Sequence, residues 1–295
     1  MQFKYYYSGI VISASFKIPF LSDKPNVLNK TEHINILFDD NLDCTDLDQS
    51  SNFYICNLKL TRVYISNIAY FEIKEHGLRI YIKKLKEFEK FQDIFFRKLL
   101  NHIIPYALYM SGDLMLHASA VSNKKYGVVF LGRSGSGKSS LSASLRDFNF
   151  LSEDSLRLKY KNHNHYIYPS YPYVNLKHNI ARFLNLHDGY NINKSNSRAT
   201  YKVAKFTSKK LILKKCYILR WSNYFKISEV SPKSILKELY NSSFGPWPLR
   251  SCKESQSRQF SQFMNLMRNV QFYLLERNIE CFFDNNDNIA SHINL

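Results

Sequence analysis

Short runs in which apolar and polar residues alternate fill the first 85 residues of the chain. A period of two places the apolar side chains on one face of a β-strand. Gly77 supplies a turn between the last two runs. The pattern predicts a small β-rich N-terminal domain over residues 1–85. The expected strands lie at residues 3–15, Ile34–Phe38, Phe53–Leu58, Arg62–Ser66, Ala69–Ile73 and Leu78–Ile82.

The pattern changes at residue 86, where apolar side chains begin to recur at helical spacing. This spacing predicts a helix over residues 86–112 that bridges the two halves of the chain. Pro105 is expected to kink or divide the helix, because proline lacks the amide donor of a helical turn. The apolar positions are Phe88, Phe91, Ile94, Phe95, Leu99, Ile103 and Leu108.

Residues 113–295 alternate between strand and helix patterns, and this predicts an α/β domain. Strands are expected at Leu114–Val121, Tyr126–Leu131 and Phe148–Leu151, with a helix from Gly137 to about Asp147.

The second half of this domain has fewer sequence patterns that predict secondary structure. Residues 169–200 look irregular, and a strand is expected over Lys210–Trp221. Ser231 as N-cap, followed by a proline, predicts a helix over Ser231–Tyr240. A second amphipathic helix is expected over residues 257–276.

The charge favours a polyanionic partner, with 41 basic and 24 acidic residues and a net charge of +17. A nucleotide, nucleic acid, acidic peptide or membrane surface would fit, and a compositional bias of the source proteome is the alternative. The basic residues are scattered, so no nucleic-acid partner is expected. No run of 18 apolar residues occurs, so no membrane partner is expected either. Five cysteines without a C-x-x-C pair predict neither a zinc site nor a disulfide framework, and favour a cytoplasmic location.

The most specific motif is G-R-S-G-S-G-K-S at Gly132–Ser139, which fits the phosphate-loop pattern G-x-x-x-x-G-K-[ST]. Its glycines let backbone amides surround phosphate oxygens, and the following helix adds the positive end of its dipole. Lys138 is expected to reach the β- and γ-phosphates, and Ser139 to bind Mg²⁺. The sequence therefore predicts that the chain binds ATP with Mg²⁺. The predicted nucleotide-binding residues are Gly132, Arg133, Ser134, Gly135, Ser136, Gly137, Lys138, Ser139 and Ser140.

Two carboxylates and a histidine flank this loop. Glu153 and Asp154 follow the next expected strand, where a carboxylate can orient Mg²⁺ or accept a proton from an attacking hydroxyl. The alternative is an exposed acidic turn. His117 lies in the strand before the loop, where it either serves catalysis or forms a structural hydrogen bond. The predicted catalytic residues are Glu153, Asp154, His117 and Lys138, and the predicted Mg²⁺ ligands are Ser139 and Asp154.

Other phosphate-loop classes fit less well. The chain has neither the Ser-Gly-Gly-type signature of ABC-type ATPases nor the Asn-Lys-x-Asp motif of small GTPases. Arg182, Arg198 and Lys202 are candidates for neutralising charge on a transferred phosphoryl group, and the sequence does not select among them.

The segments L-H-A-S-A-V, G-R-S-G-S-G-K-S and L-S-E-D together resemble the HPr kinase/phosphorylase superfamily. They look closest to its shorter HPr-kinase-like branch, which includes kinases of lasso-peptide precursors. This resemblance implies a C-terminal nucleotide-binding domain of HPr-kinase type at residues 113–295. It also implies an ATP-dependent serine kinase that acts on a peptide or protein, most of all on a ribosomally made precursor peptide.

The resemblance assigns roles residue by residue. His117 matches the family's essential histidine, and Glu153 and Asp154 match its acidic pair, with Glu in place of the first Asp. One of the pair would activate the serine hydroxyl, and which one stays open. Relatives assemble, so a homo-oligomer is also implied. A small-molecule kinase and a nucleotide-gated, non-catalytic binding module remain alternatives, and a nucleic-acid-dependent ATPase rests on charge alone.

Overall fold

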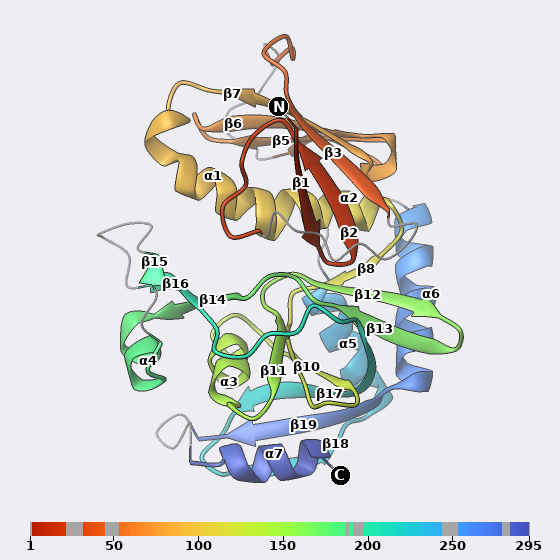
Figure 1. Cartoon of the computed structure of the whole chain (residues 1–295). Helices are drawn as coiled ribbons and strands as arrows, with labels where there is room; N and C mark the ends of the chain where they lie inside the picture. Colours follow the sequence, from red (N-terminus) through yellow and green to blue (C-terminus); the bar gives the residue numbers. More distant parts are fainter. Residues whose placement is uncertain are drawn as a thin grey trace. The chain divides into compact units, whose positions relative to one another are not determined.

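The computed structural model describes residues 2–21, 32–44, 53–186, 189–190, 198–243, 253–278 and 284–294. The chain groups into two units (Figure 1). Unit 1 comprises Met1–Met115 and Phe244–Phe260, and unit 2 comprises Leu116–Ser243 and Ser261–Leu295.

Unit 1 is built on a seven-stranded mixed sheet in the order β1-β2-β3-β7-β6-β5-β4. The pairs β2–β3 and β3–β7 are parallel, and the other neighbours are antiparallel. The strands are β1 (Phe3–Tyr7), β2 (Ile10–Ala14), β3 (His33–Phe38), β4 (Phe53–Cys56), β5 (Leu60–Ile65), β6 (Ala69–Lys74) and β7 (Arg79–Lys84).

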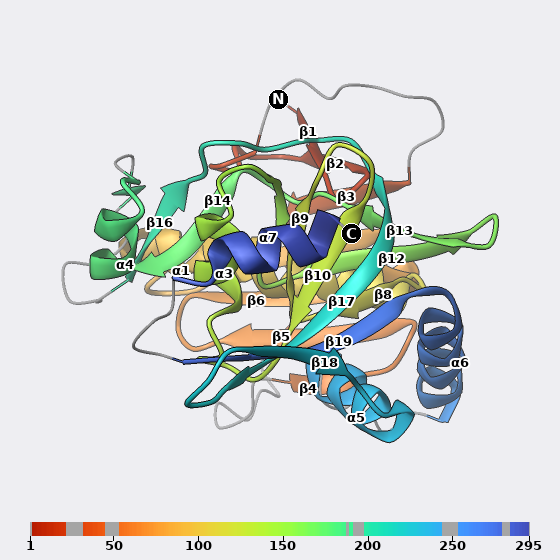
Figure 2. The same cartoon turned by 90° about the horizontal axis from the view of Figure 1, so that it is seen from below.

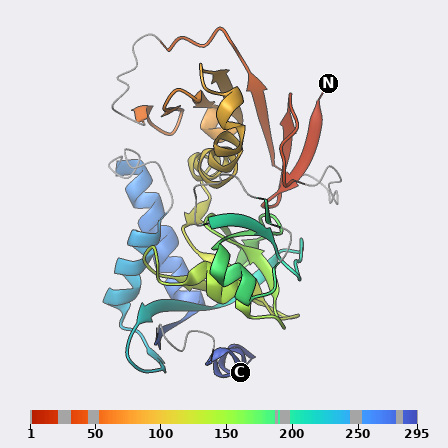
Figure 3. The same cartoon turned by 90° about the vertical axis from the view of Figure 1, so that its left-hand side faces the viewer.

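One helical segment packs on this sheet (Figures 1 and 3). It runs through α1 (Gln92–Lys98), a π-helical turn (Leu99–Ile103) and α2 (Ile104–Met110), with Pro105 in the first turn of α2. The proline therefore follows a change of helical pitch rather than dividing the segment. Phe95 is fully buried, and its ring lies 5.7 Å from that of Phe71.

Unit 2 is centred on β17 (Leu211–Trp221), which pairs in parallel with β10 (Gly127–Leu131) and with β19 (Gln271–Arg277). One core cluster joins these strands to α3 (Lys138–Ser144) and α7 (Asn286–Asn294), and α7 crosses the sheet in Figure 2. Further strands of unit 2 are β9 (Ser119–Ser122), β11 (Asn149–Ser152), β12 (Leu156–Lys161), β13 (Asn164–Tyr168) and β18 (Lys226–Glu229), and a further helix is α5 (Pro232–Ser242). The strand β8 (Leu114–Leu116) and the helix α6 (Lys253–Asn269) each have residues in both units.

The sequence predicted an irregular segment at 169–200, but the structure has strands of a separate three-stranded sheet there. Its order is β14-β16-β15, with β14 (Tyr173–Lys177), β15 (Gly189–Tyr190) and β16 (Arg198–Lys202). Val174 and Leu176 of β14 are buried in a second core cluster with α4 (His178–Phe183). The expectation of irregular structure was wrong. The strands in this segment are short and are flanked by polar residues, so apolar and polar positions alternate too weakly for the strands to be recognised in the sequence.

Two further expectations were wrong in detail. The strand expected at Leu114–Val121 is divided into β8 and β9 around His117. The helix expected over 257–276 ends at Asn269, and the following residues form β19, because pairing with β17 overrides their helical spacing. Ser231 does cap α5, since its hydroxyl accepts from the Ser234 amide. In the described part of the chain, no helix combines the length and apolar character that a membrane crossing requires.

Candidate functional site

The glycine-rich loop lies between β10 and α3, as its motif requires. Gly135 and Gly137 have φ angles of 83° and 84°, in the left-handed region that favours glycine. Gly132 has φ 144°, and a Cβ there would lie 2.6 Å from Ser136 Oγ and 3.0 Å from the Leu219 carbonyl oxygen. The tight conformation of the loop therefore depends on these glycines.

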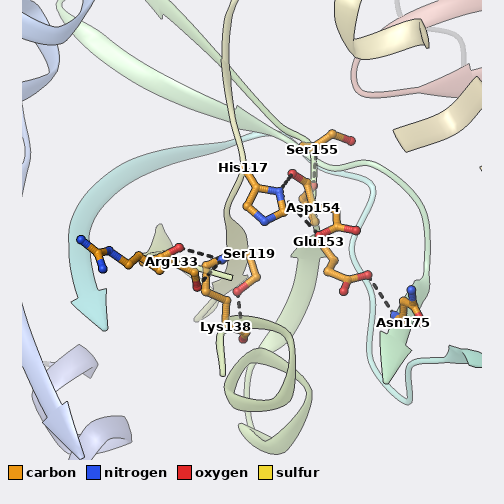
Figure 4. Close-up of polar contacts among 10 residues, drawn as sticks. His117, Ser119, Arg133, Lys138, Glu153, Asp154, Ser155 and Asn175 are labelled. Carbon is orange, nitrogen blue, oxygen red and sulfur yellow. Dashed lines mark hydrogen bonds and ion pairs between the residues drawn. The ribbon is translucent and has the colours of Figure 1, made fainter. Parts of the chain in front are cut away.

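Lys138 lies over the loop that precedes it (Figure 4). Its Nζ donates to the carbonyl oxygens of Gly132 at 2.8 Å and Arg133 at 3.3 Å. Burial lowers the pKa of Lys138, and the charges of Asp154, Glu238 and Glu153 oppose that shift. The ammonium group is thus already held beside the loop, where a phosphate would exchange for these carbonyl contacts.

Two side chains from β17 and β19 hold carbonyl groups of the loop. Trp221 Nε1 donates to the Gly135 carbonyl oxygen at 2.9 Å, and Arg277 Nη2 donates to the Ser136 carbonyl oxygen at 2.9 Å. Trp221 and Arg277 are register partners on β17 and β19, and the guanidinium carbon lies 5.0 Å from the indole ring centroid. These two hydrogen bonds hold successive carbonyls of the loop in place and so fix its backbone conformation. The sequence carried no signal for this pair, since the residues meet the loop only through strand pairing.

The acidic pair follows β11, and its two members have different surroundings. Glu153 is 5% exposed and accepts a hydrogen bond from the Asn175 amide at 2.9 Å. Burial, then the charge of Asp154, raises the pKa of Glu153 to about 8, although Ser139, Asn175 and Arg198 pull it down. Asp154 is half-buried and has a φ of 62°, a left-handed conformation that Asp adopts more readily than most residues.

His117 lies directly beside Asp154. Its Nδ1 is 3.1 Å from the Asp154 carbonyl oxygen and 3.7 Å from the carboxylate Oδ1. Burial lowers the pKa of His117 and Lys138 lowers it further, whereas Asp154 raises it. The hydrogen bond to the carbonyl makes Nδ1 the donor, so the neutral ring carries its lone pair on Nε2.

These groups surround one cavity of about 490 Å³. Asp154 lines it, whereas Glu153, Gly132, Arg133 and Ser136 do not. Of the three basic candidates for charge neutralisation, Arg198 lines the cavity. Sequence reasoning missed several of its wall residues, which come from the small sheet and from β17. The lining residues are His117, Ser134, Gly135, Gly137, Lys138, Ser139, Ser140, Asp154, Asn175, Leu176, Lys177, Ile180, Arg198 and Trp221.

The residues present fit a nucleoside triphosphate with Mg²⁺. The volume lies in the ordinary range of nucleotide-sized pockets, and the loop offers amides and a lysine to phosphate oxygens. Within the described ranges no group of three or more His, Cys, Asp or Glu side chains could hold a metal alone. That suits Mg²⁺, which takes one or two protein ligands together with phosphate oxygens and water.

Comparisons with known proteins give matches among solved structures only. No protein-family model matches the chain, and no curated protein matches it. Among solved structures, the chain is similar to the Hpr(Ser) kinase/phosphatase from Coxiella burnetii, with 11% identity and a TM-score of 0.31. The match covers 60% of this chain and 95% of that chain.

Proposed function

We propose that this chain is a Mg²⁺- and ATP-dependent kinase that transfers the γ-phosphoryl group to a serine hydroxyl of a peptide or protein. One observation carries the proposal: a glycine-rich phosphate loop and an Asp154–His117 pair line the same cavity. The loop and Lys138 bind phosphate, whereas the pair supplies a proton acceptor beside it.

Each residue has a distinct role in this proposal. The loop amides and Lys138 hold the phosphates, and Ser139 holds Mg²⁺, whereas Asp154, which the sequence also offered as a Mg²⁺ ligand, acts as the proton acceptor. Bound ATP supplies the γ-phosphoryl group, and Mg²⁺ supplies charge neutralisation. Trp221 and Arg277 are positioning residues, because they hold the carbonyls of Gly135 and Ser136.

Asp154 is the better proton acceptor of the acidic pair. Its carboxylate lines the cavity, where an acceptor hydroxyl can reach it. Glu153 lies behind it, and a pKa near 8 keeps this buried side chain protonated at neutral pH. Glu153 therefore positions Asn175 and Ser139, and neutral His117 orients Asp154 through its backbone carbonyl.

The acceptor class follows from the sequence resemblance, which favours a ribosomally made precursor peptide of the lasso-peptide type. The net charge of +17 agrees with an acidic acceptor.

Intact-mass spectrometry tests the proposal directly. Candidate precursor peptides with one or more serines are incubated with the protein, ATP and Mg²⁺, next to Lys138→Ala and Asp154→Asn. We expect a mass gain of one phosphate or more on a serine, which both variants lose. Phosphate gain on a small hydroxyl compound alone would favour a small-molecule kinase. Tight ATP binding without transfer to any acceptor would favour a nucleotide-gated binding module.

A further inference from the structure

The wall of the cavity opposite the phosphate loop is cationic. Residues 173–202 contain five basic residues, Lys177, Arg182, Lys194, Arg198 and Lys202, and one acidic residue, Asp188. Two of them, Lys177 and Arg198, line the cavity. Lys177 and Arg198 therefore bring two positive charges of this segment to the cavity.

Lys177 and Arg198 are direct partners across the β14–β16 ladder. Like charges opposite one another on neighbouring strands repel and destabilise the sheet. Among the ion pairs formed by the described residues, none includes either side chain. Both side chains are exposed to solvent, and two cations in register at a cavity wall can bind one anion together.

The pair lies beside the acidic residues, on the wall formed by β14 and β16. Asn175, which holds Glu153 through its amide, precedes Lys177 by two positions on β14. Two residues of strand span about 7 Å. Arg198 is close enough to lower the pKa of Glu153 by its charge. Lys138 is the cation that contacts the phosphate loop itself, and Lys177 and Arg198 add two further cations to the cavity on the β14–β16 wall.

We propose that Lys177 and Arg198 form an acceptor subsite for an anionic group, a carboxylate or a phosphoryl group, that flanks the acceptor serine. This inference rests on the proposed kinase function and specifies its substrate class: an acidic or phosphorylated serine-containing chain. The planar guanidinium of Arg198 binds such an oxyanion in a bidentate way, and the ammonium of Lys177 adds a point charge.

A binding experiment tests the subsite without any need for turnover. Three labelled peptides of one sequence carry the acceptor serine flanked on both sides by Glu, by Gln or by phosphoserine. Fluorescence anisotropy measures their affinity for the full chain loaded with Mg²⁺ and a non-hydrolysable ATP analogue. We expect the Glu or the phosphoserine peptide, or both, to bind at least about 10-fold more tightly than the Gln peptide.

The double variant Lys177→Gln/Arg198→Gln should abolish this preference. Lys202→Gln is the matched control, because it is a lysine on β16 that does not line the cavity. Calorimetric titration with MgATP and a thermal melt show whether the double variant still binds nucleotide and folds. Equal binding of all three peptides, no binding of any, or an unchanged preference in the double variant would overturn the subsite. An equal loss of MgATP affinity would also overturn it, by assigning the pair to the nucleotide.

Failure of the subsite differs from failure of the kinase proposal. Phosphoryl transfer that depends on neither Lys177 nor Arg198, on acidic and neutral peptides alike, refutes the subsite and leaves the kinase intact. Pair-dependent binding of an acidic peptide that is never phosphorylated refutes the kinase and leaves the subsite intact.

Discussion

The wild-type protein should become less stable to unfolding as pH rises, and the substitution Glu153→Gln should remove most of this loss. Glu153 is buried, and burial and Asp154 raise its pKa from 4.5 to about 8. A carboxyl with a raised folded-state pKa stabilises the fold fully below its unfolded pKa. It loses that contribution as pH rises through the folded value.

The size of the effect follows from the two pKa values. Between about pH 5.5 and pH 8 the folded state holds a proton that the unfolded state has released. The free energy of unfolding therefore falls by about 1.4 kcal/mol per pH unit, and the wild type loses roughly 3 kcal/mol of stability over this range. Gln has a similar shape and does not titrate, so the variant should keep its stability over this range.

Urea unfolding of the nucleotide-free protein at about pH 5.5 and about pH 8.5 measures both quantities. Glu229→Gln is the control, because Glu229 is an exposed carboxylate at the end of β18. Parallel pH dependence of the wild type and Glu153→Gln would refute the assignment of a protonated, buried Glu153.

Three further predictions concern the phosphate loop and its neighbours. Trp221→Phe removes the donor to the Gly135 carbonyl, a hydrogen bond worth about 1 kcal/mol. Calorimetry should therefore show roughly 5-fold weaker MgATP binding. The control Tyr224→Phe changes an exposed side chain and should leave MgATP affinity unchanged. Ser139→Ala should raise the Mg²⁺ concentration needed for half-maximal turnover and leave metal-free ATP binding unchanged; an unaltered Mg²⁺ titration would remove Ser139 from the metal site. Because burial lowers the pKa of His117, its neutral form should support activity at neutral pH, and a rate profile should fall on its acidic side. His117→Gln should lose that acidic limb, and an unchanged limb would assign it to another group.

Local motifs account for the parts of the site that the sequence could predict. A phosphate loop is a continuous segment whose glycines, lysine and serine carry their own geometry, so Gly132–Ser139 could be recognised directly. The carboxylates were suggested by their place after an expected strand, and His117 by its place in the strand before the loop. Their division into buried Glu153 and cavity-lining Asp154 required the packing of β14 against Glu153.

Residues brought in by strand pairing could not be predicted. Trp221 and Arg277 contact the loop only because β17 and β19 run in parallel register. The residues of β19 include apolar positions at helical spacing, so the sequence predicted a helix there instead of a strand. Lys177 and Arg198 became partners through β14–β16 pairing within a segment that looked irregular, and spacing along the chain carries no information about that pairing.

The most direct test measures MgATP binding and γ-phosphoryl transfer on the same samples of the wild type, Lys138→Ala and Asp154→Asn. We predict that the wild type binds MgATP and transfers phosphate to a serine peptide. Lys138→Ala should lose both properties, whereas Asp154→Asn should bind MgATP and transfer no phosphate. A wild type that does not bind MgATP, or an Asp154→Asn variant that transfers at the wild-type rate, would contradict the proposed kinase site.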